Sequence, residues 1–181
     1  LIDKILNPAR EFSPVPFWFL NDNFDRAELK RQLMDFCDKG VYGVVLHPRI
    51  GVPEEIGYLS DEFFDVIGYI IKTAQSLGMS IVLYDEGMYP SGSACGKVVE
   101  TNPEFAARGI IISDNENDGE VVAKLSDGRF IVYKKTGGTL RGIHYGEDDW
   151  DENAPLAADI LNGEAVDLFI KLTHEEYYKR F

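Results

Sequence analysis

The first 84 residues alternate short apolar runs with longer segments of helical periodicity, and this alternation constrains the fold more than any other feature of the chain. The apolar runs occupy residues 17–20, 43–46 and 80–84, and turn residues flank each of them. Between the runs, apolar residues recur at the spacing of an amphipathic helix. Runs rich in Val, Ile and Leu, connected in this way, are typical of a parallel sheet buried on both faces. We therefore predict a βαβαβ unit of class α/β.

Helix-start and helix-stop residues stand where this interpretation needs them. Asp25 is followed by Glu28 in a capping-box arrangement, and Ser60 precedes the second periodic segment. Gly40 and Gly78 follow the two segments, where a residue at positive φ is favoured. Right-handed crossovers bring the carboxyl ends of parallel strands to one edge of the sheet. We expect the polar residues after the three strands to gather there: Asn21, Asp22, His47, Arg49, Asp85 and Glu86.

The pattern changes after residue 103 to short strand-like segments separated by hairpin turns such as Asp127-Gly128. These segments are 108–113, 120–125, 129–134 and 140–145. An acidic loop follows at 147–152, and Asn162 is expected to cap one last helix that reaches Tyr177. The predicted regions are a βαβαβ unit in 1–106, an antiparallel β insertion in 107–150, and an acidic loop with a helix in 151–181.

The composition narrows the classes of partner. The 181 residues include 18 basic and 31 acidic ones, for a net charge of −13, which disfavours nucleic acid and anionic membrane surfaces as partners. No apolar run reaches the ~18 residues of a membrane helix, and no targeting signal is visible, so the compartment stays open. The two cysteines show no metal-type spacing. Because the chain opens with Leu1, we expect a processed product or a piece of a longer protein.

The strongest candidates for chemistry are Asp85 and Glu86, two adjacent acids at the end of the third apolar run. Enzymes of class α/β hold their reactive groups at this end of their strands. Adjacent strand residues point to opposite faces, so one acid is expected to face a pocket while the other braces a neighbouring loop or helix N-terminus. Burial beside Tyr84 or Tyr89 would raise the pKa of Glu86 toward the range of a general acid. The alternative is a structural carboxylate that accepts backbone N–H groups.

Other residues at this edge suit recognition of a polar substrate. Arg49 can bind hydroxyl or carboxylate groups, or can instead pair with Glu54 or Glu55 of its own loop. His47 is a pocket candidate, and Asn21 either binds substrate or starts the first helix.

Three aromatic residues, Trp18, Tyr84 and Tyr89, could stack on sugar rings. A tryptophan in a buried strand is more often a core residue, and Tyr89, in a loop, is the best candidate of the three. His174 is expected to be a surface or packing residue.

The motifs, taken together and in order, resemble a known family. The segments FWFLND, DKGVYGVVLHPRIG and LSDEFF, with YDEGMYPSGSACGKV after them, resemble the start of the (β/α)8 catalytic domain of the rhamnosidase-like glycoside hydrolases, family 106 and its relatives. The resemblance covers about residues 12–108 and resumes at 158–178, whereas the hairpin region matches only in outline. It implies a partial TIM-barrel-like unit with three of eight parallel strands.

The resemblance also implies hydrolysis of O-glycosidic bonds, such as those of rhamnosides, by carboxylate acid/base catalysis. Glu86 would then be the acid/base, and Asp85 a brace or second pocket acid. Asn21, His47, Arg49, Tyr89 and Trp18 would shape the sugar site. The other carboxylate would lie on later strands, so we expect a fragment or truncated homologue that is inactive alone.

Several alternatives remain at the sequence level. The same face could serve a non-catalytic carbohydrate-binding or interaction module, or a barrel enzyme of another type such as an isomerase. No cofactor is required by the sequence, and the family's calcium dependence finds no matching ligand set here. An open three-stranded sheet also exposes unpaired edges. We therefore predict either self-association through such an edge or its coverage by the hairpin excursion.

Overall fold

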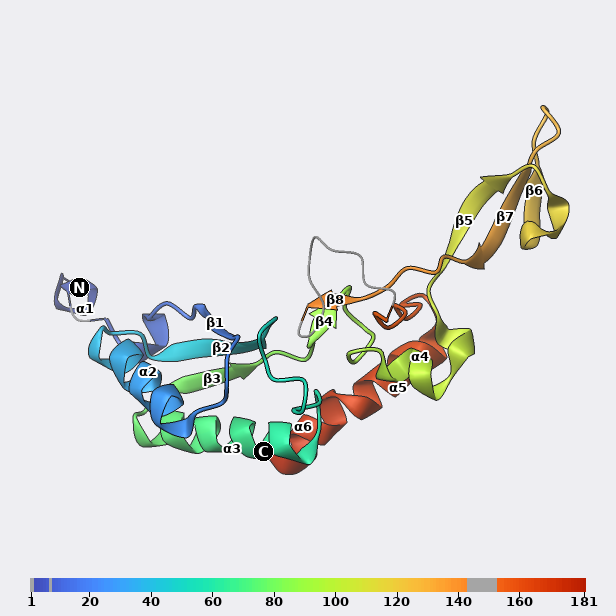
Figure 1. The fold of residues 1–181 in the computed structure, drawn as a ribbon. Helices are drawn as coiled ribbons and strands as arrows, with labels where there is room; N and C mark the ends of the chain where they lie inside the picture. Colours follow the sequence, from blue (N-terminus) through green and yellow to red (C-terminus); the bar gives the residue numbers. More distant parts are fainter. Residues whose placement is uncertain (1, 7, 143–152) are drawn as a thin grey trace.

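The computed structural model describes residues 2–6, 8–142 and 153–181, and contains the predicted parallel sheet (Figure 1). Strands β1 (Phe17–Leu20), β2 (Gly43–Pro48) and β3 (Ser80–Leu83) are parallel and adjacent in that order. Helices α2 (Arg26–Asp38) and α3 (Asp61–Ser76) connect them. The fold is therefore mixed α/β, and its described strands do not close a barrel.

The helix boundaries confirm the capping residues. Asp25 accepts hydrogen bonds from the backbone N–H groups of Ala27 and Glu28, and Ser60 accepts one from Phe63. Gly40 and Gly78 adopt φ values of 80° and 67°, in the left-handed region where glycine is favoured. The side chain of Glu28 accepts from Arg31 and Gln32 instead of reaching back to Asp25, so the reciprocal half of the capping box is not made.

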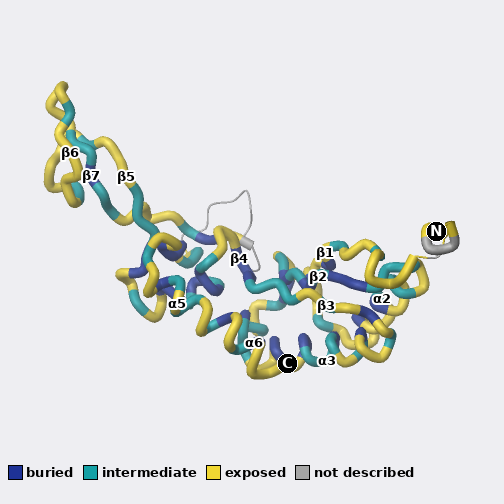
Figure 2. The backbone as a smooth tube through the Cα atoms, turned by 180° about the vertical axis from the view of Figure 1, so that it is seen from behind, coloured by how far each residue is buried: buried dark blue, intermediate teal, exposed yellow. Residues whose placement is uncertain are grey.

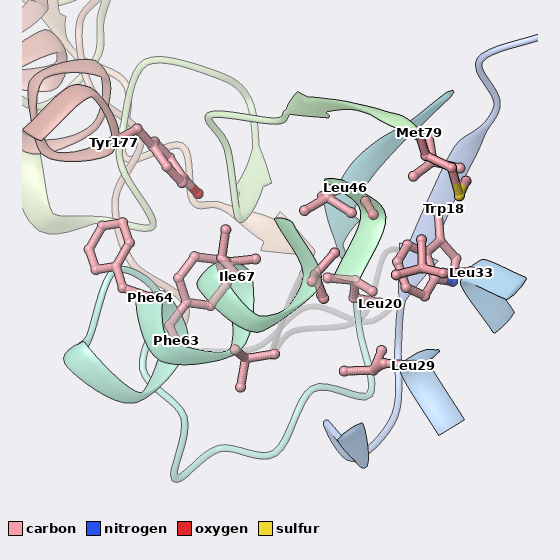
Figure 3. Packing of buried hydrophobic residues seen from close by; sticks show 14 of the residues in the cluster. Trp18, Leu20, Leu29, Leu33, Leu46, Phe63, Phe64, Ile67, Met79 and Tyr177 are labelled. Carbon is pink, nitrogen blue, oxygen red and sulfur yellow. The ribbon is translucent and has the colours of Figure 1, made fainter. Parts of the chain in front are cut away.

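Only one face of the parallel sheet is buried, which corrects the prediction of a sheet covered on both faces. The buried face carries Trp18, Leu20, Val44 and Leu46 against α2 and α3 (Figure 3). On the other face, side chains such as those of Phe17, Phe19 and Val82 are about half exposed. The reason is topological: the strand order β1-β2-β3 runs in one direction, so two right-handed crossovers place both helices on the same face.

The antiparallel part forms two further sheets, and its strands do not cover the edge of the parallel sheet. β5 (Arg108–Ser113), β6 (Glu120–Lys124) and β7 (Phe130–Lys135) form a sheet of order β5-β7-β6 that projects from the rest (Figure 1). The short β8 (Arg141–Gly142) pairs with β4 (Met88–Tyr89) instead. For the described residues, the prediction that the excursion covers the open edge is wrong. The acidic loop lies outside the described residues.

The expected last helix is two helices. Asn162 caps α5 (Gly163–Leu172) as predicted, but the helix breaks at Thr173 and resumes as α6 (His174–Arg180). The Thr173 side chain is fully buried and donates its hydroxyl to the carbonyl oxygen of Phe169. The break turns Tyr177 into the main core, where its ring lies 5.4 Å from that of Phe64.

The remaining elements are short. They are α1 (Ile2–Leu6), α4 (Lys97–Thr101) and three 3-10 turns, η1 (Arg10–Phe12), η2 (Pro103–Phe105) and η3 (Glu116–Asp118). A second apolar cluster packs α4 against α5 and includes Val98, Phe105 and Ala165. Among the helices that the structure describes, none is long and apolar enough to cross a membrane.

Candidate functional site

The parallel register brings the carboxyl ends of β1, β2 and β3 to one edge, as predicted. Glu86 lies just beyond β3 and is 2% exposed. Its Oε1 atom accepts a hydrogen bond from the backbone N–H of Gly92, so the loop after β3 folds back onto the carboxyl group. Its Oε2 atom is buried and has no hydrogen-bond partner among the described residues. A buried, unpartnered carboxyl oxygen is costly in a folded protein.

Burial also controls the charge of Glu86. The pKa of this carboxyl is raised from 4.5 to about 8: burial is the largest cause, the negative charge of Asp85 adds to it, and the backbone N–H groups of Gly92 and Ser93 oppose it. With a pKa near 8, the group carries its proton at neutral pH. A protonated carboxyl can donate a hydrogen bond or a proton, which is the property that general acid catalysis requires.

The side chain of Asp85 contacts the C-terminal helices. Its Oδ2 atom lies 2.5 Å from Nε2 of His174, the first residue of α6. Both side chains of this pair are about half exposed, at 41% for Asp85 and 54% for His174. Asp85 thus pairs with the first residue of α6, which agrees with the expectation that one of the two acids braces a neighbouring element.

The exposed face of the parallel sheet carries a row of rings. The His47 ring lies 4.2 Å from that of Tyr84 and 5.1 Å from that of Phe19. The guanidinium carbon of Arg49 lies 5.5 Å from the centre of the Phe19 ring, a cation–π contact. Burial and the nearby charge of Arg49 lower the pKa of His47, whose Nδ1 is buried without a hydrogen bond among the described residues. His47 and Arg49 therefore belong to one surface.

Of the other predicted binding residues, Trp18 and Tyr89 lie apart from this surface, whereas Asn21 lies against the loop after β2. Trp18 is 5% exposed, and its indole N–H donates to Oε1 of Gln32 at 2.7 Å, so it is a core residue on the opposite face. Tyr89 is exposed on β4, with Arg141 over its ring. Asn21 is exposed and lines a hollow of about 440 Å³ beside α2.

Two residues of this region were not identified from the sequence as contributors. Tyr58 is buried beneath the site, and the ring of Tyr58 lies 3.0 Å from where a Cβ on Gly87 would stand. Burial raises the pKa of the Tyr58 hydroxyl, and the nearby Tyr177 hydroxyl raises it further. The Tyr58 hydroxyl has no hydrogen-bond partner among the described residues. His174 is the second of these residues. Its contact with Asp85 could not be predicted, because no local sequence signal shows that α6 lies near the end of β3.

No metal or family assignment comes from these observations. Among the described residues, no group of three or more His, Cys, Asp or Glu side chains could hold a metal ion. Comparison with protein-family models, with curated proteins and with solved structures gives no match to this chain.

Proposed function

We propose that this chain forms part of a (β/α)8 glycoside hydrolase domain, in which Glu86 is the proton donor to the leaving oxygen of an O-glycosidic bond. The observation that carries the proposal is the state of Glu86: a buried carboxyl with a pKa of about 8, one unpartnered oxygen, and a position just after a parallel strand. Glycosidases need one carboxyl group that stays protonated until the bond breaks. Rhamnosides are the substrate class that the sequence resemblance favours.

The open face of the sheet supports the barrel interpretation. In such a barrel, alternate strand residues fill the interior in layers. On the open face, Phe17, Val45 and Val82 are in register across the three strands and Phe19 pairs with His47, so these are the side chains that would point into the barrel. Further parallel strands would bury this face and would bring the second carboxylate that hydrolysis requires. Calcium has no ligand set among the described residues, so it has no part in the proposal.

Access to Glu86 requires the loop after β3 to move. The loop holds Oε1 through Gly92, and Oε2 has almost no contact with solvent. Substrate binding would therefore displace this loop, and the proton on Oε2 would pass to the departing sugar oxygen.

The test uses the complete gene product that contains residues 1–181, assayed on aryl α-L-rhamnosides. Replacing Glu86 by Gln should lower turnover at least a hundredfold for poor leaving groups, because general acid catalysis contributes about 10²–10⁴. Leaving groups that need no proton should be affected much less. Glu55→Gln, an exposed acid in the loop after β2, is the matched control and should match the wild type. If Glu86→Gln turned over every substrate as fast as the wild type, Glu86 would not be the proton donor.

A non-catalytic carbohydrate-binding module is the second candidate, because half-exposed rings form a continuous surface on the sheet. Calorimetric titration with a panel of sugars, beside the hydrolysis assay, separates the two functions. Binding that Phe19→Ala abolishes, without hydrolysis by the complete gene product, favours the module.

A further inference from the structure

The antiparallel sheet of β5, β7 and β6 buries very little of its own surface. Figure 2 shows these strands as exposed and intermediate tube with one short buried stretch in β7. Within the sheet Val132 is buried, whereas Ile110, Ile112 and Val122 are 68%, 55% and 58% exposed. Contiguous exposed apolar residues of this kind usually mark an interface. This inference does not depend on the proposed function.

The two edges of the sheet differ in how they are protected. The β6 edge carries Glu120 and Lys124, and a bulge interrupts its pairing with β7 between Val121 and Ala123. Charged residues and bulges are the devices that keep edge strands from pairing with other chains. The β5 edge has neither within its central residues 110–112, which are three isoleucines in regular register with β7. β5 is therefore the edge that is able to accept another strand.

The hydrogen-bond pattern shows which β5 groups face outward. Thr136 donates its backbone N–H to the carbonyl of Ala107, and bonded pairs in an antiparallel ladder recur at every second residue. Residues 109, 111 and 113 consequently face β7. The N–H and C=O groups of Arg108, Ile110 and Ile112 point away from it, toward a side of the sheet where no described strand pairs with β5.

We propose that β5 pairs antiparallel with β5 of a second copy of this chain, about a two-fold axis at Ile111. The outward groups of Ile110 then meet those of Ile112 of the second copy. The same register places Arg108 opposite Asp114 of the second copy on both sides of the axis. A two-fold contact needs such a self-complementary surface, and the sequence from Arg108 to Asp114 has a cation at one end, an acid at the other and isoleucines between.

Neighbouring registers lose this complementarity. A shift by two residues in one direction places Arg108 opposite Ile112 of the second copy, and a shift in the other direction places Asp114 opposite Ile110. Each leaves a charge against an apolar side chain. Arg108 now pairs with Glu104 at 2.9 Å, but Glu104 also pairs with Lys135 at 2.8 Å, so Arg108 can turn to the second copy without leaving Glu104 unpaired.

The first test is sedimentation velocity of the 181-residue chain over a concentration series. The wild type should show a monomer–dimer equilibrium. Ile112→Pro removes an outward N–H without touching the ladder to β7 and should weaken the dimer at least tenfold. Val122→Lys, on the protected edge, should leave it unchanged. A monomer at every concentration, or a dimer that tolerates Ile112→Pro and loses affinity with Val122→Lys, would overturn the proposal.

A second test determines the register of the pairing between the two β5 strands, and it does not depend on whether the Ile112→Pro variant folds. In a background with Cys37→Ser and Cys95→Ser, Ile111→Cys places two thiols at a non-hydrogen-bonded pair, where Cα atoms are about 4.5 Å apart and can form a disulfide. Oxidation should give a covalent dimer for Ile111→Cys and leave Val122→Cys monomeric. The reverse result contradicts the pairing of β5 with β5.

Discussion

Glu86 shows how a single residue can be unfavourable for stability and still suit a function. An ionised carboxyl at 2% exposure would lose most of its hydration, and the backbone N–H groups of Gly92 and Ser93 compensate only part of that loss. The proton removes the charge and leaves a neutral donor on the unpartnered oxygen. The same environment that costs stability at high pH therefore provides an acid at neutral pH.

The first prediction concerns stability against pH. Because the folded chain holds the Glu86 proton up to a pKa of about 8 while the ordinary value is 4.5, the folded state binds more protons than the unfolded state between these values. Its stabilisation is complete below pH 4.5 and is lost as pH rises through 8, by up to about 1.4 kcal/mol per pH unit. Glu86→Gln, which cannot ionise, should remove this loss in urea denaturation. If the free energy of unfolding of Glu86→Gln and of the wild type changed with pH in the same way from pH 5 to 8, the prediction would be wrong. Glu55→Gln is the control, and its free energy of unfolding should show the same pH dependence as that of the wild type.

The second prediction separates the two causes of the raised pKa. Asp85→Asn removes the neighbouring negative charge but can still accept a hydrogen bond from His174, so α6 should stay in place. The pKa of Glu86 should fall below 8 and remain above 4.5, because burial is the larger cause and does not change. Carbon-13 titration of the glutamate carboxyl groups by NMR measures it directly. A return of the Glu86 pKa to 4.5 would show that charge, and not burial, dominates.

At the scale of elements, the sequence predicted what local residues decide. Asp25, Ser60 and Asn162 cap the helices, and the apolar runs become the parallel strands, because caps and periodicity act within a few residues. The break at Thr173 was missed because it depends on the packing of Tyr177 against core residues that are distant in the sequence. The contact of Asp85 with His174 was missed for the same reason, as 89 positions separate the pair. The exposed sheet face was missed because periodicity reports an apolar surface without reporting what covers it.

The third prediction concerns the loop after β3. Gly92 has φ of 94°, and a Cβ at this position would stand 2.8 Å from the Ile160 side chain. Gly92→Ala should therefore displace the loop, lengthen its hydrogen bond to Glu86 and destabilise the fold by about 1–3 kcal/mol. Chemical denaturation gives the change in stability. Gly128→Ala, at φ 91° with nothing near its Cβ, is the matched control for backbone strain alone. An equal cost in both variants would mean that the contact with Ile160 is unimportant.

The whole molecule combines a well-packed part with a projecting one. The main core is formed by α2, α3 and the parallel sheet together with Tyr177 of α6. Residues of the N-terminal half and a residue near the C-terminus therefore share one core. The sheet of β5, β7 and β6 lies outside that core and contributes no residue to it. Stability and self-association should therefore reside in different parts of the chain.

The last prediction removes the projecting sheet. Arg108 and Lys135 are directly paired at its base, so residues 109–134 can be replaced by Asn-Gly, a two-residue hairpin turn. The shortened chain should keep its helical circular dichroism, because α2, α3, α5 and α6 lie outside the deletion. Its free energy of unfolding should fall by no more than about 1–3 kcal/mol, because the sheet contributes no residue to the main core and the deletion removes one hydrogen bond to a buried group, from Tyr133 to Asp159. Sedimentation velocity should show a monomer at concentrations where the parent dimerises. Loss of the cooperative unfolding transition would show that the sheet supports the core, and persistence of the dimer would assign self-association to the open edges of β1 or β3.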